Sequence, residues 1–275
     1  MKKVSIVLPV FNGEEHLAEA IDSVLAQTYE NLELIVVDDC STDKTPQIVS
    51  DFAQKDKRVK VIQNKVNQRL PKSLNIGFSH ADGEYLTWTS DDNLYKPNAI
   101  EEMADYLGNH AGVDMVYCDY TIIDENGAKK KDNILEESER LIWTNTVGAC
   151  FLYRREVAEK VGNYNSEMFL AEDYDYWLRI YQAGTIKHLP RNLYCYRHHS
   201  KSLTATRQEQ IKHQTVLLFL VHWKFISKKL KGIRTKLHYC DMILNMEAEE
   251  YRKKTFRELR KRVPLYGIYK ALGKG

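Results

Sequence analysis

The sequence EYLTWTSDDNLYKP (residues 84–97) joins an apolar, β-favouring run to two adjacent carboxylates, Asp91 and Asp92. The run predicts a buried strand. In open α/β sheets ligands bind at the carboxyl ends of the strands, and carboxylates there hold hard divalent cations that neutralise nucleotide phosphates. Ser90 to Asn93 is equally typical of a turn, so the rest of the chain must decide between a turn and a ligand site.

Strands and helices alternate around this stretch over the first 120 residues. The expected strands are Ser5–Pro9, Leu32–Asp38, Val59–Gln63 and Glu84–Trp88, and the expected helices are Glu14–Gln27, Thr45–Lys55, Pro71–His80 and Pro97–Leu107. This order predicts an α/β fold with a parallel sheet and helices on both faces. Glu125-Asn126-Gly127 predicts a hairpin turn, so the second half is expected to mix strands and helices before a helical end beyond Thr206.

Charge is distributed unevenly along the chain, whose length of 275 residues suits one large domain or one domain with an appendage. From Arg207 to Gly275 there are 17 Lys or Arg and 6 Asp or Glu, a balance of +11. Since the whole chain has 40 basic and 38 acidic residues, the first 206 residues carry −9. An acidic body with a basic tail suggests that the tail faces an anionic membrane or a nucleic acid.

The cysteines and the N-terminus indicate the compartment. The five cysteines are scattered, odd in number and never in a C-x-x-C spacing, which favours reduced thiols and argues against a disulfide framework or a zinc site. The start, MKKVSIVLPVF, has a short apolar run that contains proline and leads into acidic residues, so it predicts a first strand rather than a signal peptide. No apolar stretch approaches the roughly 20 residues of a membrane span. The expected location is the cytoplasm.

Two further clusters end strands in the first half of the chain. In IVVDDCSTDKT (residues 35–45) a carboxylate at the end of the second strand can accept hydrogen bonds from a base N–H or a ribose hydroxyl. Asp39 is the residue expected to contact a ligand, whereas Ser41 to Asp43 are expected to cap the next helix. In LPVFNGEEH (residues 8–16) Phe11 offers a stacking face for a base.

Two clusters follow in the second half. AEDYDYWLRI (residues 171–180) predicts a helix with Glu172 and Asp173 in its first turn, where the helix dipole favours anions. These carboxylates either belong to an ordinary helix start or provide a general base. In YRHHSKSLT (residues 196–204) Arg197 suits a diphosphate, and the paired histidines suit metal ligation or phosphate contact as well as an ordinary surface.

Together these segments resemble the inverting nucleotide-sugar glycosyltransferases of family 2. The segments that carry the resemblance are SIVLPVFNGEEHL, LIVVDDCSTDKT, LNIGFSHADGEYLTWTSDDN, GACFLYRREVAEKVGNY, AEDYDYWLRI and YRHHSKSLT. The resemblance implies a GT-A fold, with a mostly parallel central sheet flanked by helices. Residues 1–206 would form the catalytic domain, with a nucleotide-binding half (about 1–120) and an acceptor-binding half (121–206). Residues 207–275 would form a basic helical C-terminal extension.

The resemblance also implies roles for individual residues. Asp91 matches the last Asp of the family's Asp-x-Asp motif and would bind Mn²⁺ or Mg²⁺, and His199 matches a histidine that contacts the metal or the diphosphate. Asp173 matches the second residue of the Glu-Asp motif and would be the general base, with Glu172 beside it. The residues expected to bind the nucleotide-sugar are Pro9, Phe11, Glu14, Asp39, Asn67, Lys72, Asp91 and Arg197.

Two positions depart from the family pattern. Thr89 stands where many relatives begin the motif with Asp, which weakens the case for a metal without removing Asp91. Leu74 stands where the family commonly has Arg before Asn, and Lys72 is the residue that would supply the missing positive charge.

The expected function is transfer of a sugar, with inversion, from a nucleotide-sugar to a glycan or a lipid-linked saccharide, and by family habit the donor is a UDP-sugar. A non-catalytic nucleotide-sugar-binding partner subunit is the alternative that the altered motif at Thr89 raises. A nucleotidyltransferase is a weaker alternative, because the loop after the first strand is acidic. The extension 207–275 would either contact an anionic membrane at its inner face or cap the catalytic domain, and no nucleic acid is expected because no reader module is present.

Overall fold

The computed structural model describes residues 1–271. The chain forms two compact units. The first comprises Met1–Glu167 and Tyr176–His199, and the second comprises Met168–Asp175 and the chain from Ser200 onward. Residues 272–275 of the predicted extension lie outside the described residues.

The first unit contains the sheet. Its strands are β1 (Val4–Val10), β2 (Leu32–Asp38), β3 (Val59–Gln63), β4 (Tyr85–Trp88), β5 (Leu94–Tyr95), β6 (Met115–Ile123), β7 (Lys129–Asn133), β8 (Phe151–Arg154) and β9 (Ile186–Arg197). Its helices are α1 (Leu17–Leu25), α2 (Thr45–Lys55), α3 (Leu70–Ser79), α4 (Ala99–Asn109), α5 (Arg155–Val161) and most of α6 (Glu172–Ala183). The four strands and four helices expected over the first 120 residues are confirmed, with shifts of a few residues at their ends.

The sheet is mostly parallel. Its strand order is β3-β2-β1-β4-β8-β6-β9-β5, with β7 pairing to β6. Strands β1, β2, β3, β4, β6 and β9 run in one direction, and β5, β7 and β8 run against them. The reversal at β8 was not predicted. The expected hairpin turn lies between β6 and β7, where Gly127 has a φ of +84° that favours glycine.

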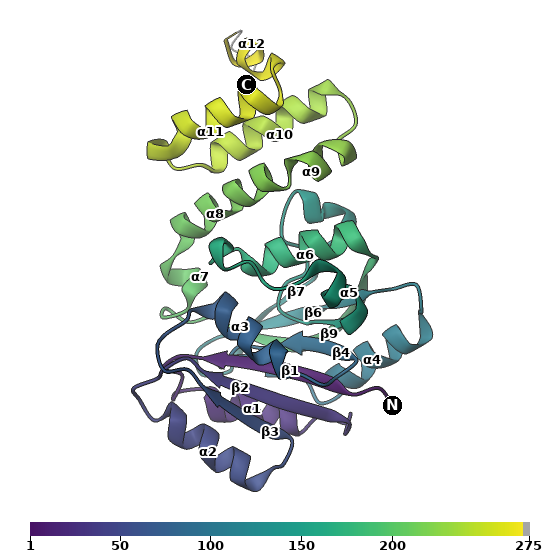
Figure 1. Cartoon of the computed structure of the whole chain (residues 1–275), viewed down its shortest axis with the longest axis vertical. Coiled ribbons are helices and arrows are strands. Elements are labelled where there is room, and N and C mark those ends of the chain that lie inside the picture. Colours follow the sequence, from purple (N-terminus) through teal and green to yellow (C-terminus); the bar gives the residue numbers. More distant parts are fainter. Residues whose placement is uncertain (272–275) are drawn as a thin grey trace. The chain divides into compact units, whose positions relative to one another are not determined.

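Helices cover both faces of the parallel half, as predicted (Figure 1). Every residue of β1 and β2 is buried, which is typical of parallel strands between two helical layers. On one face, alternate side chains of β1, such as Ile6 and Leu8, share a core with α1, α2 and α4. On the other face Gly77 of α3 lies against Val7, where an added Cβ would come within 2.4 Å of a Val7 methyl group.

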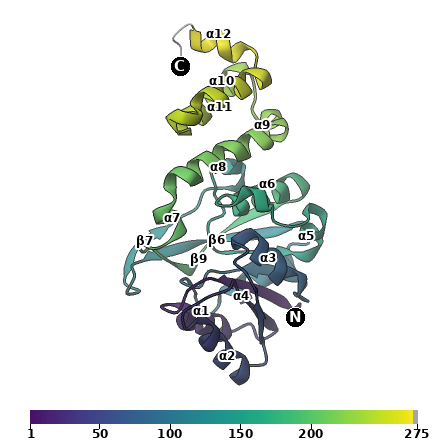
Figure 2. The same cartoon turned by 60° about the vertical axis from the view of Figure 1, so that its left-hand side comes forward.

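The second unit is helical, as expected for the end of the chain. After the start of α6 it continues with α7 (Leu203–Thr206), α8 (Gln208–Val221), α9 (Trp223–Lys229), α10 (Ile233–Met246), α11 (Glu249–Arg262) and α12 (Leu265–Ala271). Helices α10 and α11 run side by side (Figures 1 and 2). Phe219, Tyr239 and Tyr266 are fully buried in this unit. None of the helices within residues 1–271 has the length and apolar character needed to span a bilayer.

The division into units differs from the expected boundary at residue 206. The second unit starts at Ser200 and also takes in Met168–Asp175, the segment that begins α6. The physical reason is that Tyr174 and Asp175 contact Phe219 and His222. The segment expected to carry the general base therefore folds with the helical part of the chain.

Candidate active site

The loops that follow the first three strands have unusual backbone conformations. Asn12, Cys40 and Arg69 have φ values of 54°, 68° and 66° in the left-handed region, which non-glycine residues seldom occupy. Each lies in the loop that follows β1, β2 or β3, at the carboxyl edge of the sheet. Such conformations cost about 1–3 kcal/mol each and gather at ligand sites, so they mark this edge independently of the sequence motifs.

Side chains tie the first two of these loops together. The Oε2 atom of Glu14 accepts a hydrogen bond of 2.8 Å from the Lys44 amide. The hydroxyl of Ser41 accepts one of 2.9 Å from the Asn12 amide. Of the residues expected to cap α2, Asp43 accepts a hydrogen bond of 3.0 Å from the Thr45 amide, whereas Ser41 and Thr42 bond to Asn12 of the first loop. Glu14 thus has a structural partner at the place where a nucleotide contact was expected.

The Asp39 carboxylate orders the loop after β3. It is 4% exposed and accepts hydrogen bonds from the amides of Gln68 at 2.7 Å and Arg69 at 2.8 Å. The side-chain amide of Asn64 donates a third bond of 2.8 Å. A carboxylate has about four acceptor positions, so Asp39 keeps capacity for one further donor from a ligand. Asn67, expected near the base, is exposed in the loop that Asp39 holds.

The other residues expected around the base differ in exposure. Pro9 is buried within β1, opposite Val37 of β2. Phe11 is 51% exposed directly after β1, so its ring face is open to a stacking partner. Lys72 is exposed on α3, whereas Leu74 is fully buried. The arginine that the family commonly has at position 74 is thus replaced by a core residue.

Asp91 lies against the backbone of the first loop. A Cβ added to Gly13 would come within 2.0 Å of Asp91 Oδ2, so only glycine leaves room for this carboxylate. Burial, followed by the charge of Asp92, raises the pKa of Asp91 to about 7. A cation at this position would favour the ionised form and relieve the repulsion between the two carboxylates.

Asp92 and His199 form the second half of the acidic site. His199 Nε2 lies 2.9 Å from Asp92 Oδ2, while Asp92 Oδ1 is buried with no hydrogen-bond partner. Buried carboxylate oxygens without partners are costly, and hard divalent cations prefer oxygen ligands. The orphan oxygen therefore fits a cation. Within residues 1–271 no three His, Cys, Asp or Glu residues are arranged to hold a metal, so the donor phosphates and water would have to complete its coordination.

Arg197 was expected to bind a diphosphate. In the structure its side chain contacts three other segments of the chain. Its side chain is 2% exposed. The guanidinium donates to the carbonyl oxygens of Asp92 at 2.9 Å and Glu125 at 2.8 Å, and pairs with the Glu19 carboxylate at 2.7 Å. A diphosphate contact would require one of these partners to be displaced, so the structure gives Arg197 a role in holding the Asp91–Asp92 loop.

Thr89, at the altered motif position, points into the protein. It is 2% exposed, and its hydroxyl lies 2.6 Å from that of Tyr194, which is also buried. Because both groups are neutral, the hydrogen bond satisfies them without a cation. An aspartate at this position would place a further negative charge beside buried Tyr194.

The expected base lies in the second unit. Leu170 has a φ of 77°, and its amide donates a hydrogen bond of 2.6 Å to Glu172 Oε2. Glu172 is 5% exposed, and burial followed by the charge of Asp173 raises its pKa to about 8. Asp173 is half-buried, so it is the more accessible of the two carboxylates.

The sequence is similar to those of known glycosyltransferases. Residues 5–162 match the sequence model of glycosyl transferase family 2. An uncharacterised glycosyltransferase of Rickettsia typhi is 32% identical over 238 residues, covering 82% of this chain and 72% of that protein. The putative glycosyltransferase EpsE of Bacillus subtilis is 35% identical over 188 residues, covering 66% of this chain and 68% of that protein.

Solved structures share the fold. TarS residues 1–349 of S. aureus, in complex with UDP-GlcNAc, superposes with a TM-score of 0.67 at 17% identity, covering 99% of this chain and 92% of that one. The mannosyltransferase PcManGT of Pyrobaculum calidifontis, in complex with GDP-Man and Mn²⁺, gives a TM-score of 0.61 at 17% identity, covering 98% and 75%. The chain belongs to glycosyl transferase family 2 and is a glycosyltransferase with the GT-A fold.

Proposed function

We propose that this protein transfers a hexosyl or N-acetylhexosaminyl group, with inversion, from a UDP-sugar to a hydroxyl group of a growing glycan or lipid-linked saccharide. Such a reaction belongs to the synthesis of cell-surface polysaccharides or glycoconjugates. The observation that carries the proposal is the acidic site of Asp91, Asp92 and His199, with its orphan buried oxygen. Phe11 would stack on the base, and Asp39 would accept a hydrogen bond from the nucleoside.

We assign the divalent cation to Asp91 and Asp92. The two carboxylates supply hard oxygen ligands, and His199 is hydrogen-bonded to Asp92. Bound there, Mg²⁺ or Mn²⁺ would neutralise the charge that grows on the departing diphosphate. His199 would orient the Asp92 carboxylate through its Oδ2 atom or become a ligand itself.

Asp173 is our candidate for the general base. It would take the proton from the acceptor hydroxyl as that oxygen bonds to the anomeric carbon and the bond to the diphosphate breaks. A single displacement inverts the anomeric configuration and needs no covalent nucleophile. Glu172, protonated at neutral pH because of its raised pKa, would keep its hydrogen bond to Leu170 without adding a second charge.

A thermal-shift panel tests donor and metal together. The full chain is mixed with UDP-N-acetylglucosamine, UDP-glucose, GDP-mannose or a dTDP-sugar, each with Mn²⁺, Mg²⁺ or EDTA, and release of the nucleoside diphosphate by hydrolysis, with water as the acceptor, is measured. We expect stabilisation by UDP-sugars that is lost in EDTA, together with release of UDP. Binding of a nucleotide-sugar without release of its nucleoside diphosphate under any condition would favour the alternative suggested by Thr89, a non-catalytic partner subunit. Stabilisation that is unchanged in EDTA would refute the cation assignment.

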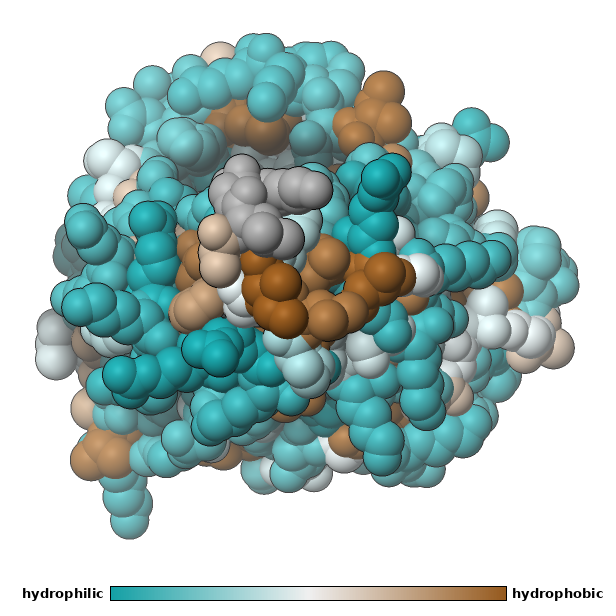
Figure 3. All heavy atoms as spheres, turned by 90° about the horizontal axis from the view of Figure 1, so that it is seen from above, coloured by the Kyte–Doolittle hydropathy of each residue, from teal (hydrophilic) through white to brown (hydrophobic). Residues whose placement is uncertain are grey.

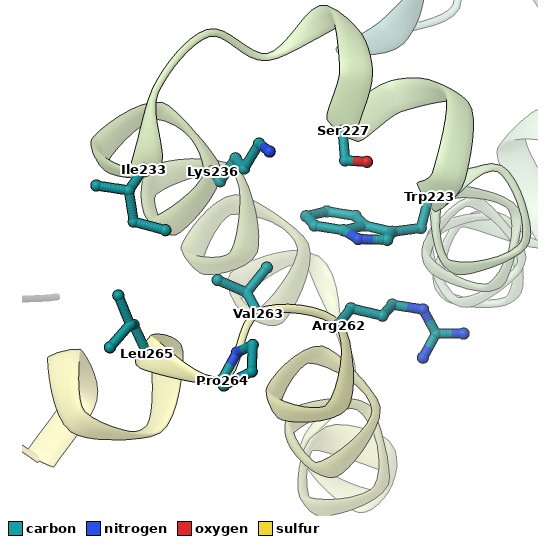
Figure 4. A pocket seen from close by; sticks show the side chains of 8 residues that line it. All are labelled: Trp223, Ser227, Ile233, Lys236, Arg262, Val263, Pro264 and Leu265. Atoms are coloured by element: carbon teal, nitrogen blue, oxygen red, sulfur yellow. The ribbon is translucent and has the colours of Figure 1, made fainter.

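We also propose that the second unit makes peripheral contact with an anionic membrane, where a lipid-linked acceptor would lie. A pocket of about 300 Å³ lies among α9, α10, α11 and α12. Figure 4 shows Trp223, Val263 and Pro264 around it, with Ile233 and Leu265 together on one side. Ile233 and Leu265 are 49% and 52% exposed, and Figure 3 shows apolar side chains gathered on the face that carries α12.

Lys236 lines this pocket, and Lys228 and Lys231 lie close to it along the chain. Lys228, Lys231 and Lys236 form no ion pair with any residue that the structure describes. Exposed apolar side chains beside unneutralised lysines suit an anionic bilayer, where each lysine adds about 1 kcal/mol of attraction.

Sedimentation with vesicles tests the membrane contact. Binding to phosphatidylcholine vesicles that contain phosphatidylglycerol should exceed binding to phosphatidylcholine alone. The double substitution Ile233→Asp and Leu265→Asp should abolish it. Val66→Asp is the matched control, because Val66 is 60% exposed in the first unit. Equal sedimentation of all three proteins would refute the contact and leave the helices as a cap.

A further inference from the structure

A buried histidine–carboxylate pair holds the segment that carries the candidate base. Asp175 lies in the first turn of α6, two residues after Asp173. Its Oδ1 atom is 2.8 Å from Nε2 of His222, the residue between α8 and α9. The side chains are 3% and 8% exposed. A buried carboxylate of this kind is strongly destabilised when its partner is removed.

Other contacts fix the same turn within the second unit. The Tyr174 ring packs edge-on against Phe219 of α8, with 5.8 Å between centroids. On the preceding side, Glu172 accepts the hydrogen bond of the left-handed Leu170. The neighbours of Asp173 are therefore held, while Asp173 is itself half-buried. A side chain presented by a fixed turn is preorganised to meet a substrate.

We propose that His222 is a positioning residue for sugar transfer, because it holds Asp175 and thereby fixes the turn that presents Asp173. This inference rests on the proposed role of Asp173 as the base. It gives the C-terminal helices a function in the reaction in addition to any membrane contact. Misplacement of a reacting group by about 1 Å can cost 100-fold in rate, so loosening this turn should appear in kcat.

The same helix provides a matched control. His213 of α8 is 2.8 Å from Glu247, a carboxylate that is likewise buried, at the junction of α10 and α11. His213 precedes His222 by nine residues, about 13 Å along a helix. Loss of either pair should destabilise the second unit, but only loss of the His222 pair should disturb the turn at Asp173.

The experiment compares His222→Ala, His222→Gln, His213→Ala and Asp173→Asn in the full chain. UDP release from UDP-N-acetylglucosamine, or from the donor that the thermal-shift panel selects, gives kcat and KM. His222→Ala should lower kcat by about 10–100-fold with donor KM nearly unchanged. His222→Gln should restore most of the activity, because the glutamine side-chain nitrogen can donate from nearly the position of His Nε2. His213→Ala should lower kcat by less than about threefold, since the His213–Glu247 pair is remote from Asp173.

Equal losses of kcat in His222→Ala and His213→Ala, or normal kcat in His222→Ala, would overturn the positioning role. If His222→Ala does not fold, a glutamine variant that folds but is as slow as Asp173→Asn would overturn it as well. Near-normal rates in Asp173→Asn would refute the base assignment, and the positioning role with it. A slow Asp173→Asn with equal effects at the two histidines would refute the positioning role alone.

Discussion

The Asp91 carboxylate lies where a side chain at position 13 would have to be. An alanine Cβ at position 13 would lie 2.0 Å from Asp91 Oδ2 and 2.6 Å from a Val10 methyl group. Gly13→Ala should therefore displace the carboxylate and weaken Mn²⁺ binding in the presence of UDP at least about tenfold, the equivalent of 1.4 kcal/mol. Titration calorimetry measures this. Gly112→Ala is the control, because a Cβ there meets no atom within 4 Å. Equal affinities in the two variants would contradict the assignment.

Glu172 should make stability depend on pH. Its pKa is raised from 4.5 to about 8, so its protonated form stabilises the fold fully below about pH 4.5, and this contribution is lost as the pH rises through 8. Glu172→Gln keeps an acceptor for the Leu170 amide but cannot ionise. Its free energy of unfolding should match that of the wild type near pH 5 and exceed it by at least about 1 kcal/mol at pH 9. Urea unfolding measures both, and a difference independent of pH would contradict the raised pKa.

Some site residues were predictable from sequence because their chemistry follows a local motif. The acidic pair at Asp91 and the carboxylates that begin α6 are of this kind, although their roles remain proposals. The partners of Arg197 were not predictable, because Glu19, Asp92 and Glu125 lie far from it in the sequence. The same holds for the close approach of Gly13 to Asp91, which depends on the packing of two loops.

Strand β9 ends at Arg197, whose side chain binds three other segments of the chain. Arg197→Lys keeps the charge but loses the planar fork that reaches two carbonyl groups and Glu19. It should lower the free energy of unfolding by about 2–4 kcal/mol, since it breaks a buried network. Arg191→Lys on the same strand is the control, because Arg191 is 66% exposed and should cost under about 0.5 kcal/mol. If chemical denaturation gave equal losses of unfolding free energy for Arg197→Lys and Arg191→Lys, the role of Arg197 in holding these segments would be contradicted.

The regular elements of the first half were well predicted because their apolar periodicities are strong. Strands β2 and β3 and helix α2 have the predicted bounds. The antiparallel β8 was missed, since a four-residue strand has too short a pattern to reveal its direction. The short β5, which pairs with β9, was missed for the same reason.

The division of the chain by charge, at residue 206, differs from its division by contacts. The basic C-terminal part of the chain is helical in the described residues. The compact unit that it forms also includes the segment 168–175. Sequence periodicity could not show this, because the Asp175–His222 pair joins residues 47 positions apart. Removing residues 207–275 to test membrane contact would therefore also remove His222, which pairs with Asp175, so surface substitutions are the better test.

Asp173, as the proposed general base, is the residue on which sugar transfer by this chain depends most. The most direct test is UDP release by Asp173→Asn, compared with wild type in Mn²⁺, together with UDP affinity by calorimetry. We expect the rate to fall by about 10²–10⁴-fold, the usual contribution of a general base, with UDP affinity unchanged. A variant that released UDP at nearly the wild-type rate would contradict it.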